Sequence, residues 1–122
     1  MVGFSRDEIV SACLMDFRDS GALHVESYLD VLLECLLQFE GVGIEMSGVY
    51  IQRDEDLDNI PRYLIGIENG MAFEFIGEVA IYEMSEGARR INEWCEMNVS
   101  KDKREVMERC QRLMSLYGGC GE

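Results

Sequence analysis

The stretch RYLIGIENGMAFEFIGEVAIY, residues 62–82, gives the clearest local indication of the fold. Asn69 and Gly70 are a residue pair preferred in two-residue type I′ turns, and apolar residues alternate with others on both sides of them. This pattern predicts a β-hairpin that turns at Asn69 and Gly70. The residues expected on its apolar faces are Tyr63, Ile65 and Ile67 before the turn and Met71, Phe73 and Phe75 after it.

Residues 78–82 continue the alternation after a bend at Gly77. Successive side chains of a strand point to opposite faces of a sheet. If residues 71–82 keep one register, one face is expected to carry Phe73, Phe75, Val79 and Ile81. The other face is then expected to carry Glu74, Glu78 and Tyr82. The alternation therefore predicts that Glu74 and Glu78 stand together on the solvent face.

The segments on both sides of this stretch complete the fold class. Residues 41–52 alternate in the same way and add further strands, while apolar residues at helical spacing come before and after the strands. Ser5 and Glu8 form a capping-box pattern at the start of the first helix. The expected class is α+β: an antiparallel sheet of three to five strands in the middle of the chain, packed with two N-terminal and two C-terminal helices. A single domain spanning residues 1–122 is expected.

The composition is that of an ordinary soluble globular protein, with 48% hydrophobic and 29% charged residues. The longest strongly apolar run, residues 31–39, is far shorter than the roughly 20 residues that cross a bilayer. No secretory signal is visible at the N-terminus, so a cytoplasmic location is expected. The five cysteines show no C-x-x-C spacing, and the single histidine, His24, is remote from any pair of them. No metal site is therefore predicted.

The net charge of −13 is concentrated in one part of the chain. Residues 40–86 carry eleven carboxylates against two arginines, a net charge of −9. Phosphate binding needs a basic surface, so direct contact with nucleic acid is not expected. An acidic face instead attracts a basic protein and pairs with its lysine and arginine side chains, although solubility alone can also explain such a surface.

The run DEDLD, residues 54–58, has carboxylates at alternate positions, as a calcium-binding loop does. Counted from Asp54, the EF-hand spacing places Asn59 where a glycine is required and Ile65 where a glutamate must close the loop. This kind of calcium site is excluded on spacing, and a cation bound without such a loop stays open as an alternative.

Catalytic motifs are absent from the sequence. It contains no G-x-S-x-G, no P-loop and no G-x-G-x-x-G pattern, and its single histidine excludes a pair of histidines. The chain is therefore expected to have no catalytic residue and no cofactor.

Residues 66–114 resemble the C-terminal half of small immunity proteins from contact-dependent growth inhibition systems, in the group that neutralises ribonuclease toxins. The similar features are the sheet segment FEFIGEVAI at 73–81, the helical segment INEWCE at 91–96 and the polar link SKDK at 100–103. The segment SEGARR, with Gly87 near the start of a helix, departs from the pattern.

The resemblance implies a non-enzymatic inhibitor whose partner is a basic toxin nuclease domain, in this group a ribonuclease. Such a nuclease holds RNA phosphate in a basic cleft, which agrees with the charge pattern. The residues expected to contact the toxin are Asp54, Glu55, Asp56, Asp58, Glu68, Glu74 and Glu78, with Tyr50 or Tyr63 as an anchor. Two alternatives stay open: an acidic adaptor for another basic protein, and a domain that binds a small ligand or cation.

Overall fold

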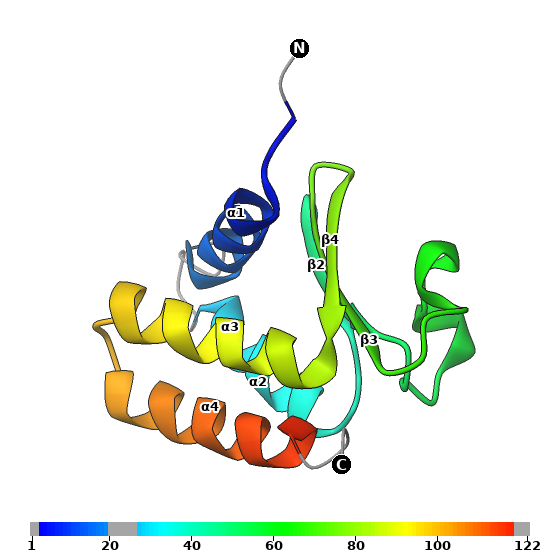
Figure 1. Ribbon diagram of the computed structural model, residues 1–122. Coiled ribbons are helices and arrows are strands. Elements are labelled where there is room, and N and C mark those ends of the chain that lie inside the picture. The colour runs from blue at the N-terminus through cyan, green and yellow to red at the C-terminus, as the bar shows by residue number, and fades with distance from the viewer. Residues whose placement is uncertain (1–2, 20–26, 119–122) are drawn as a thin grey trace.

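The computed structural model describes residues 3–19 and 27–118 (Figure 1). Its helices are α1 (Arg6–Asp19), α2 (Tyr28–Leu37), α3 (Met84–Asn98) and α4 (Lys103–Gly118), with the short 3-10 helices η1 (Leu57–Asn59) and η2 (Arg62–Leu64). Its strands are β1 (Val42–Gly43), β2 (Ser47–Ile51), β3 (Gly70–Phe75) and β4 (Glu78–Glu83). The predicted α+β class is confirmed. In the described residues, two α-helices precede the four-stranded antiparallel sheet in the sequence and two follow it.

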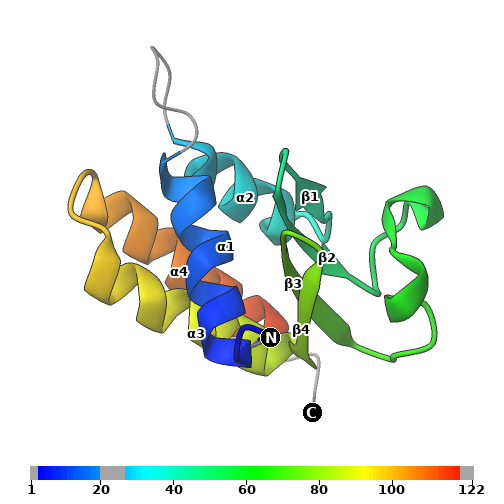
Figure 2. The same ribbon diagram turned by 90° about the horizontal axis from the view of Figure 1, so that it is seen from above.

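The helices and the segment between β2 and β3 lie on opposite sides of the sheet, whose strand order is β1-β2-β3-β4. Figures 1 and 2 show the four α-helices on one side and the segment with η1 and η2, in green, on the other. We call residues 52–69 the arm. The face of the sheet toward the helices is the inner face, and the opposite one is the outer face.

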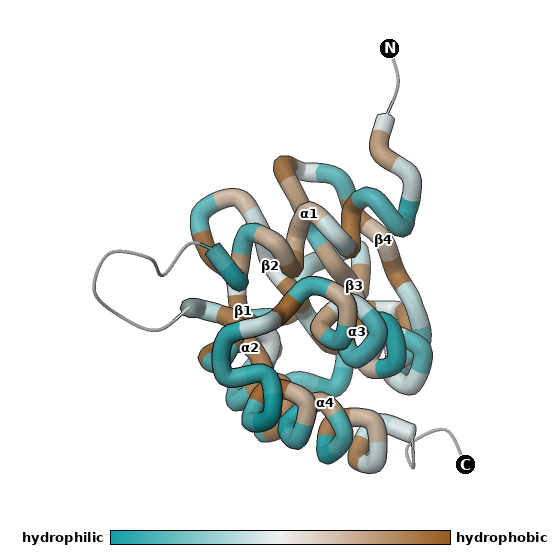
Figure 3. The backbone as a smooth tube through the Cα atoms, turned by 90° about the vertical axis from the view of Figure 1, so that its left-hand side faces the viewer, coloured by the Kyte–Doolittle hydropathy of each residue, from teal (hydrophilic) through white to brown (hydrophobic). Residues whose placement is uncertain are grey.

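The main core fills the space between the inner face and the helices. Val49 and Phe73 contribute from the sheet, and Leu14, Leu36 and Ile91 from three helices, all with no measurable exposure. Figure 3 shows hydrophilic and hydrophobic residues recurring along each helix, as expected for helices with one buried side. The four helices therefore cover the inner face and leave the outer face to the arm.

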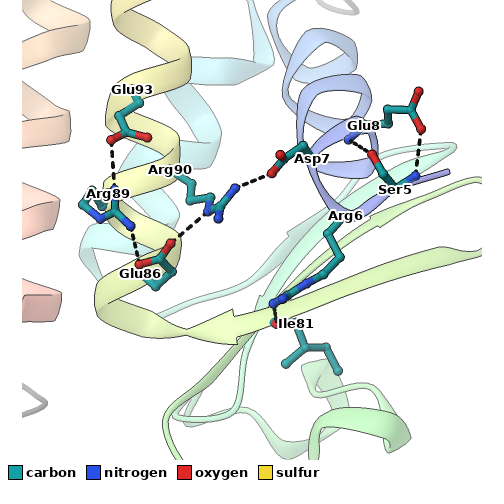
Figure 4. A network of polar contacts seen from close by, with 9 residues as sticks. All are labelled: Ser5, Arg6, Asp7, Glu8, Ile81, Glu86, Arg89, Arg90 and Glu93. Carbon is teal, nitrogen blue, oxygen red and sulfur yellow. Dashed lines mark hydrogen bonds and ion pairs between the residues drawn. The ribbon is translucent and has the colours of Figure 1, made fainter.

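Two arginines join α1, α3 and the edge strand β4. The Arg6 guanidinium lies 4.2 Å from the centre of the Tyr82 ring and donates a 2.5 Å hydrogen bond to the Ile81 carbonyl. Arg90 lies 4.7 Å from the same ring and also pairs with Asp7 at the start of α1 (Figure 4). These contacts fix the N-terminal end of α1 against β4 and α3.

The first turn of α1 has the predicted capping box. The Ser5 amide donates to the Glu8 carboxylate at 2.8 Å, and the Glu8 amide donates to the Ser5 hydroxyl at 3.1 Å (Figure 4). Both bonds satisfy amides that have no partner inside the helix.

The prediction of a hairpin that turns at Asn69 and Gly70 is wrong. Residues 62–64 form η2, and the chain reaches β3 through turns in which Ile67 donates to the Leu64 carbonyl and Gly70 to the Ile67 carbonyl, both at 3.0 Å. The reason is non-local: β3 already pairs with β2 along one edge and with β4 along the other. No position in the ladder is left for residues 62–68.

The true hairpin joins β3 to β4 through Ile76 and Gly77. Both residues have positive φ, 49° and 81°, as a two-residue type I′ turn requires, and Phe75 pairs with Glu78 across it. Paired residues share a face, so Glu78 lies on the inner face with Phe75. The next pair, Glu74 and Val79, lies on the outer face.

This turn also corrects the predicted faces of β4. Val79 and Ile81 were expected to share a face with Phe73 and Phe75, and this is wrong: Ala80 pairs with Phe73, so Val79 and Ile81 lie on the outer face. The prediction assumed one continuous alternation, whereas a two-residue turn shifts the alternation of the second strand by one residue relative to the first.

The described cysteines are free. Cys13, Cys95 and Cys110 are buried and Cys35 is half-buried. Burial raises the pKa of the Cys13 thiol to about 12. His24 and Cys120 lie outside the described residues. In the part of the chain that the structure describes, no helix has both the length and the apolar character needed to cross a membrane.

Candidate functional site

The carboxylates around the sheet and arm have few cationic partners. The ion pairs of the described residues gather on the helices, for example between Arg109 of α4 and Glu34 of α2 at 2.8 Å. Of the eleven carboxylates in residues 40–86, only Glu86 forms an ion pair with another described residue, through Arg89 and Arg90. The negative charge of this segment is therefore not neutralised within the described structure.

The outer face is built around Tyr50 of β2. Gly43 and Gly48 lie beside it on the same face, and a Cβ atom on either glycine would overlap the Tyr50 side chain. The absence of side chains at these two positions lets the ring lie across the strands. Tyr50 is half-buried, and burial followed by the negative charge of Glu74 raises its pKa above the ordinary value.

A second, small apolar cluster holds the arm on the outer face. Ile60 and Leu64 of the arm pack with Ala72 of β3, and the half-buried side chains of Tyr50 and Val79 pack against these three. The arm is thus attached to the sheet by side-chain packing over its middle. This attachment places η2, which begins at Arg62, next to the outer face.

Tyr63 of η2 reaches across to β3 and donates a 2.8 Å hydrogen bond to the Glu74 carboxylate. Burial, followed by this hydrogen bond, raises the pKa of Tyr63 above its ordinary value. Glu74 is half-buried, and its charge acts on both Tyr50 and Tyr63. We call Tyr50, Tyr63 and Glu74 the Tyr-Glu-Tyr cluster. A carboxylate held beside aromatic rings is suited to bind a cationic side chain, through both charge and ring contact.

The arm and the tip of the β3–β4 hairpin also carry exposed apolar side chains. Leu57 and Ile65 of the arm are 77% and 57% exposed, and Ile76 at the hairpin tip is 53% exposed. Tyr63 and Ile67 are exposed as well, at 38% each. Tyr63 belongs to the cluster, and Ile65 follows it two residues later in the arm. Exposed apolar residues beside a polar group are typical of protein-binding surfaces.

Asp54 does not lie on this surface. It is only 5% exposed and accepts hydrogen bonds from the amide of Gly41 at 2.8 Å, the amide of Asp56 at 2.9 Å and the side-chain amide of Asn59 at 2.6 Å. The prediction that Asp54 contacts a partner is therefore corrected: its carboxylate satisfies buried donors and shapes the start of the arm.

The other arm carboxylates are exposed, but they do not join the Tyr-Glu-Tyr cluster in a single patch. Glu55 and Asp56 line a hollow of about 430 Å³ together with Glu40. Asp56 also caps η1 by accepting from the amide of Asp58 at 3.1 Å, and Asp58 itself is exposed. These residues form a separate acidic edge at the base of the arm.

Glu68 and Glu78 lie elsewhere. Glu68 is exposed and lines a pocket of about 500 Å³ beside Tyr82 and Glu83 of β4. Glu78 is on the inner-face side of the hairpin, next to Gly3. The predicted pairing of Glu74 with Glu78 on the solvent face is therefore wrong. The structure brings Tyr50, Tyr63 and Glu74 together, and it places Glu55, Asp56 and Asp58 on the separate edge.

Sequence reasoning missed two features of the surface. Val79 and Ile81 were assigned to the core face, although they contribute apolar area to the outer face. A groove between α2 and α4, of about 530 Å³, is lined by acids that include Glu34 and Glu105. Its only signal in the sequence is the spacing of Asp30 and Glu34, four residues apart on α2, and Arg109 of α4 pairs with both of these acids.

Within residues 3–19 and 27–118, no three or more histidine, cysteine, aspartate or glutamate side chains are grouped so that they could hold a metal ion. Comparisons of this chain with protein-family models, with curated proteins and with solved structures gave no match.

Proposed function

We propose that this protein is a cytoplasmic immunity protein that binds and inhibits a toxin nuclease. The resemblance of residues 66–114 favours a ribonuclease as this toxin. The observation that carries the proposal is the side of the molecule opposite the helices. There a half-buried carboxylate, Glu74, accepts a hydrogen bond from Tyr63 on the same face of the sheet as Tyr50, and exposed apolar residues such as Ile65 belong to the same segment, the most acidic of the chain.

The charge of this segment suits a nuclease as partner. A ribonuclease must bind the phosphates of its substrate, so the surface around its cleft is basic. An inhibitor with an uncompensated acidic face gains association rate from attraction over distances up to the Debye length, about 8 Å at physiological salt. Rapid binding is what neutralisation of a toxin already inside the cell requires.

The mixture of apolar and charged side chains supports tight rather than transient binding. Strong protein interfaces have a central aromatic or apolar anchor with a polar rim. Tyr50, Tyr63 and Ile65 would supply the centre together with Glu74. The separate acidic edge of Glu55, Asp56 and Asp58 would add to the long-range attraction of a basic partner. The internal hydrogen bonds of Asp54 and the packing of Leu64 hold the arm in one conformation, which lowers the entropy lost on binding.

Co-expression tests this proposal. Ribonuclease and deoxyribonuclease toxin domains of contact-dependent growth inhibition systems are expressed from an inducible promoter in a bacterial host, with and without this protein. We expect survival with at least one toxin, and recovery of a stoichiometric complex with a catalytically inactive form of it. Protection from none of the toxins contradicts the proposal, and a complex without protection points instead to an adaptor that binds a basic protein.

A further inference from the structure

We infer that the Tyr-Glu-Tyr cluster accepts one arginine side chain of the partner, with its guanidinium bound to the Glu74 carboxylate and held against the tyrosine rings. The identity of the partner as a basic protein rests on the proposed function. The chemistry of the acceptor rests on the three side chains themselves.

The Glu74 carboxylate has one strong donor and no cation among the described residues. Its Oε1 atom accepts the Tyr63 hydroxyl at 2.8 Å, and none of the ion pairs of the described residues includes it. The side chain is half-buried, so part of its hydration is already lost in the free protein. A partner cation would therefore meet a carboxylate that is partly desolvated and fixed in position.

The two aromatic rings are also fixed before any partner binds. The hydrogen bond to Glu74 holds Tyr63, and Gly43 and Gly48 leave the space that the Tyr50 ring fills. A cation that binds to Glu74 therefore meets the Tyr63 side chain already in place, with Tyr50 on the same face of the sheet, and needs no change in the fold. Preorganisation of this kind reduces the conformational cost of binding.

Arginine fits this arrangement better than lysine. A guanidinium is planar, so it can stack on a ring while its N–H groups donate to a carboxylate in the same plane. The protein already contains this combination: Arg90 lies 4.7 Å from the centre of the Tyr82 ring and donates to Glu86 at 3.0 Å. The Tyr-Glu-Tyr cluster has the aromatic ring and the carboxylate of that combination, and no arginine in residues 3–19 and 27–118 forms an ion pair with Glu74.

A metal ion is a weaker candidate for the same place. Calcium takes six to eight oxygen ligands, and magnesium about six, whereas the cluster supplies one carboxylate whose Oε1 already accepts a hydrogen bond. The aromatic rings would add nothing to the binding of a small, strongly hydrated ion. The observations therefore favour an organic cation with a flat face.

The test is an NMR titration with three probes: N-acetyl-arginine amide, N-acetyl-lysine amide and the neutral N-acetyl-citrulline amide. We expect saturable shifts for arginine, centred on residues 48–50, 63 and 72–74, with a dissociation constant of about 1 to 10 mM because a single side chain makes few contacts. Binding of the lysine and citrulline probes should be weaker, for citrulline by at least about tenfold.

Glu74→Gln and Glu78→Gln are the matched variants. Each removes one carboxylate from the same hairpin, and glutamine at position 74 can still accept the Tyr63 hydroxyl. Loss of arginine binding in Glu74→Gln alone supports the inference, and the amide spectrum of each variant shows whether its fold is intact. Equal losses of arginine binding in both variants would mean diffuse attraction to an acidic surface. That result would overturn the inference. So would the absence of saturable shifts at these residues in the wild-type protein.

The probe titration and the protection experiment can fail independently. If the protein neutralises a toxin but arginine does not bind at the cluster, the inference is wrong and the proposed function stands. If arginine binds as expected and no toxin is neutralised, the acceptor site stands and the proposed function is wrong.

Discussion

Glu74 and Glu78 lie on opposite faces of one β-hairpin, because Phe75 pairs with Glu78 across the turn at Ile76 and Gly77. Only Glu74 stands beside Tyr63 on the outer face. The two glutamates have the same charge and belong to the same hairpin, but only Glu74 is part of the Tyr-Glu-Tyr cluster. They therefore provide a natural comparison between local contact and long-range attraction.

Reversal of charge at Glu74 is expected to weaken toxin binding much more than reversal at Glu78. Glu74→Lys places a cation in the centre of the proposed contact, so the dissociation constant should rise by at least about 30-fold, mostly through faster dissociation. Glu78→Lys should slow association by only a few-fold, and added salt should reduce that effect. Surface plasmon resonance at two salt concentrations measures both. Equal effects of the two variants on dissociation would remove Glu74 from the contact.

Replacement of Asp54 by alanine should lower the stability of the fold rather than act on binding alone. It would leave the buried Gly41 amide and the Asn59 side chain without an acceptor that they now reach at 2.8 and 2.6 Å. The expected loss is about 2 to 4 kcal/mol in the free energy of unfolding, measured by urea denaturation. The exposed neighbour Glu55 is the control, since Glu55→Ala should change stability by less than about 0.5 kcal/mol. An unchanged free energy of unfolding in Asp54→Ala would show that these hydrogen bonds contribute little to stability.

Gly87 is expected to resist substitution even by alanine. It is buried in α3, and a Cβ atom there would overlap the sulfur of Met71, which is itself fully buried. Alanine is favoured over glycine in a helix by about 1 kcal/mol. Overpacking of the core costs about 1 to 3 kcal/mol, so Gly87→Ala should have a lower melting temperature than the wild type. Ser85→Ala, at an exposed position of the same helix, is the control, and a Gly87→Ala protein at least as stable as the wild type would contradict the packing described for Met71.

Alkaline pH should weaken the fold through Tyr63. Its pKa is raised in the folded protein, mainly by burial, so the folded state keeps the proton that the unfolded chain loses near pH 10. The contribution of Tyr63 to stability is therefore complete below about pH 10 and is lost as the pH rises toward its folded value. Urea denaturation at pH 8 and pH 10.5 should show a smaller loss of stability in Tyr63→Phe than in the wild type. Identical losses in the two proteins would mean that Tyr63 titrates normally.

The helices could be predicted from the sequence because their signals are local. Ser5 and Glu8 lie three residues apart and make the capping box by themselves. The hairpin could not be predicted in the same way. Asn69 and Gly70 are favourable turn residues, but the strand order, which depends on distant residues, gives both edges of β3 to β2 and β4. The turn that does form has Ile76 at φ 49°, a conformation that β-branched residues rarely adopt, so local preferences point away from it.

The candidate site was predictable only in part, for the same reason. Tyr50, Tyr63 and Glu74 were proposed as contact residues and lie together, although Tyr63 comes from a 3-10 helix rather than a strand. Asp54 was grouped with its acidic neighbours because a run of carboxylates suggests a solvated loop. Its burial depends on Gly41, thirteen residues earlier in the chain, and on how the arm folds back toward it. Neither is visible in the run itself.

The most direct test of the proposed function is the rate at which a purified ribonuclease toxin domain cleaves a labelled RNA in the presence of this protein. For the toxin that this protein neutralises in cells, an amount of wild-type protein equimolar with the toxin should abolish RNA cleavage. The Glu74→Lys protein should require at least about 30-fold more for the same inhibition, in line with its weaker binding. Full cleavage by every toxin domain tested, with the wild-type protein in large excess, would contradict the proposal that this protein inhibits a nuclease.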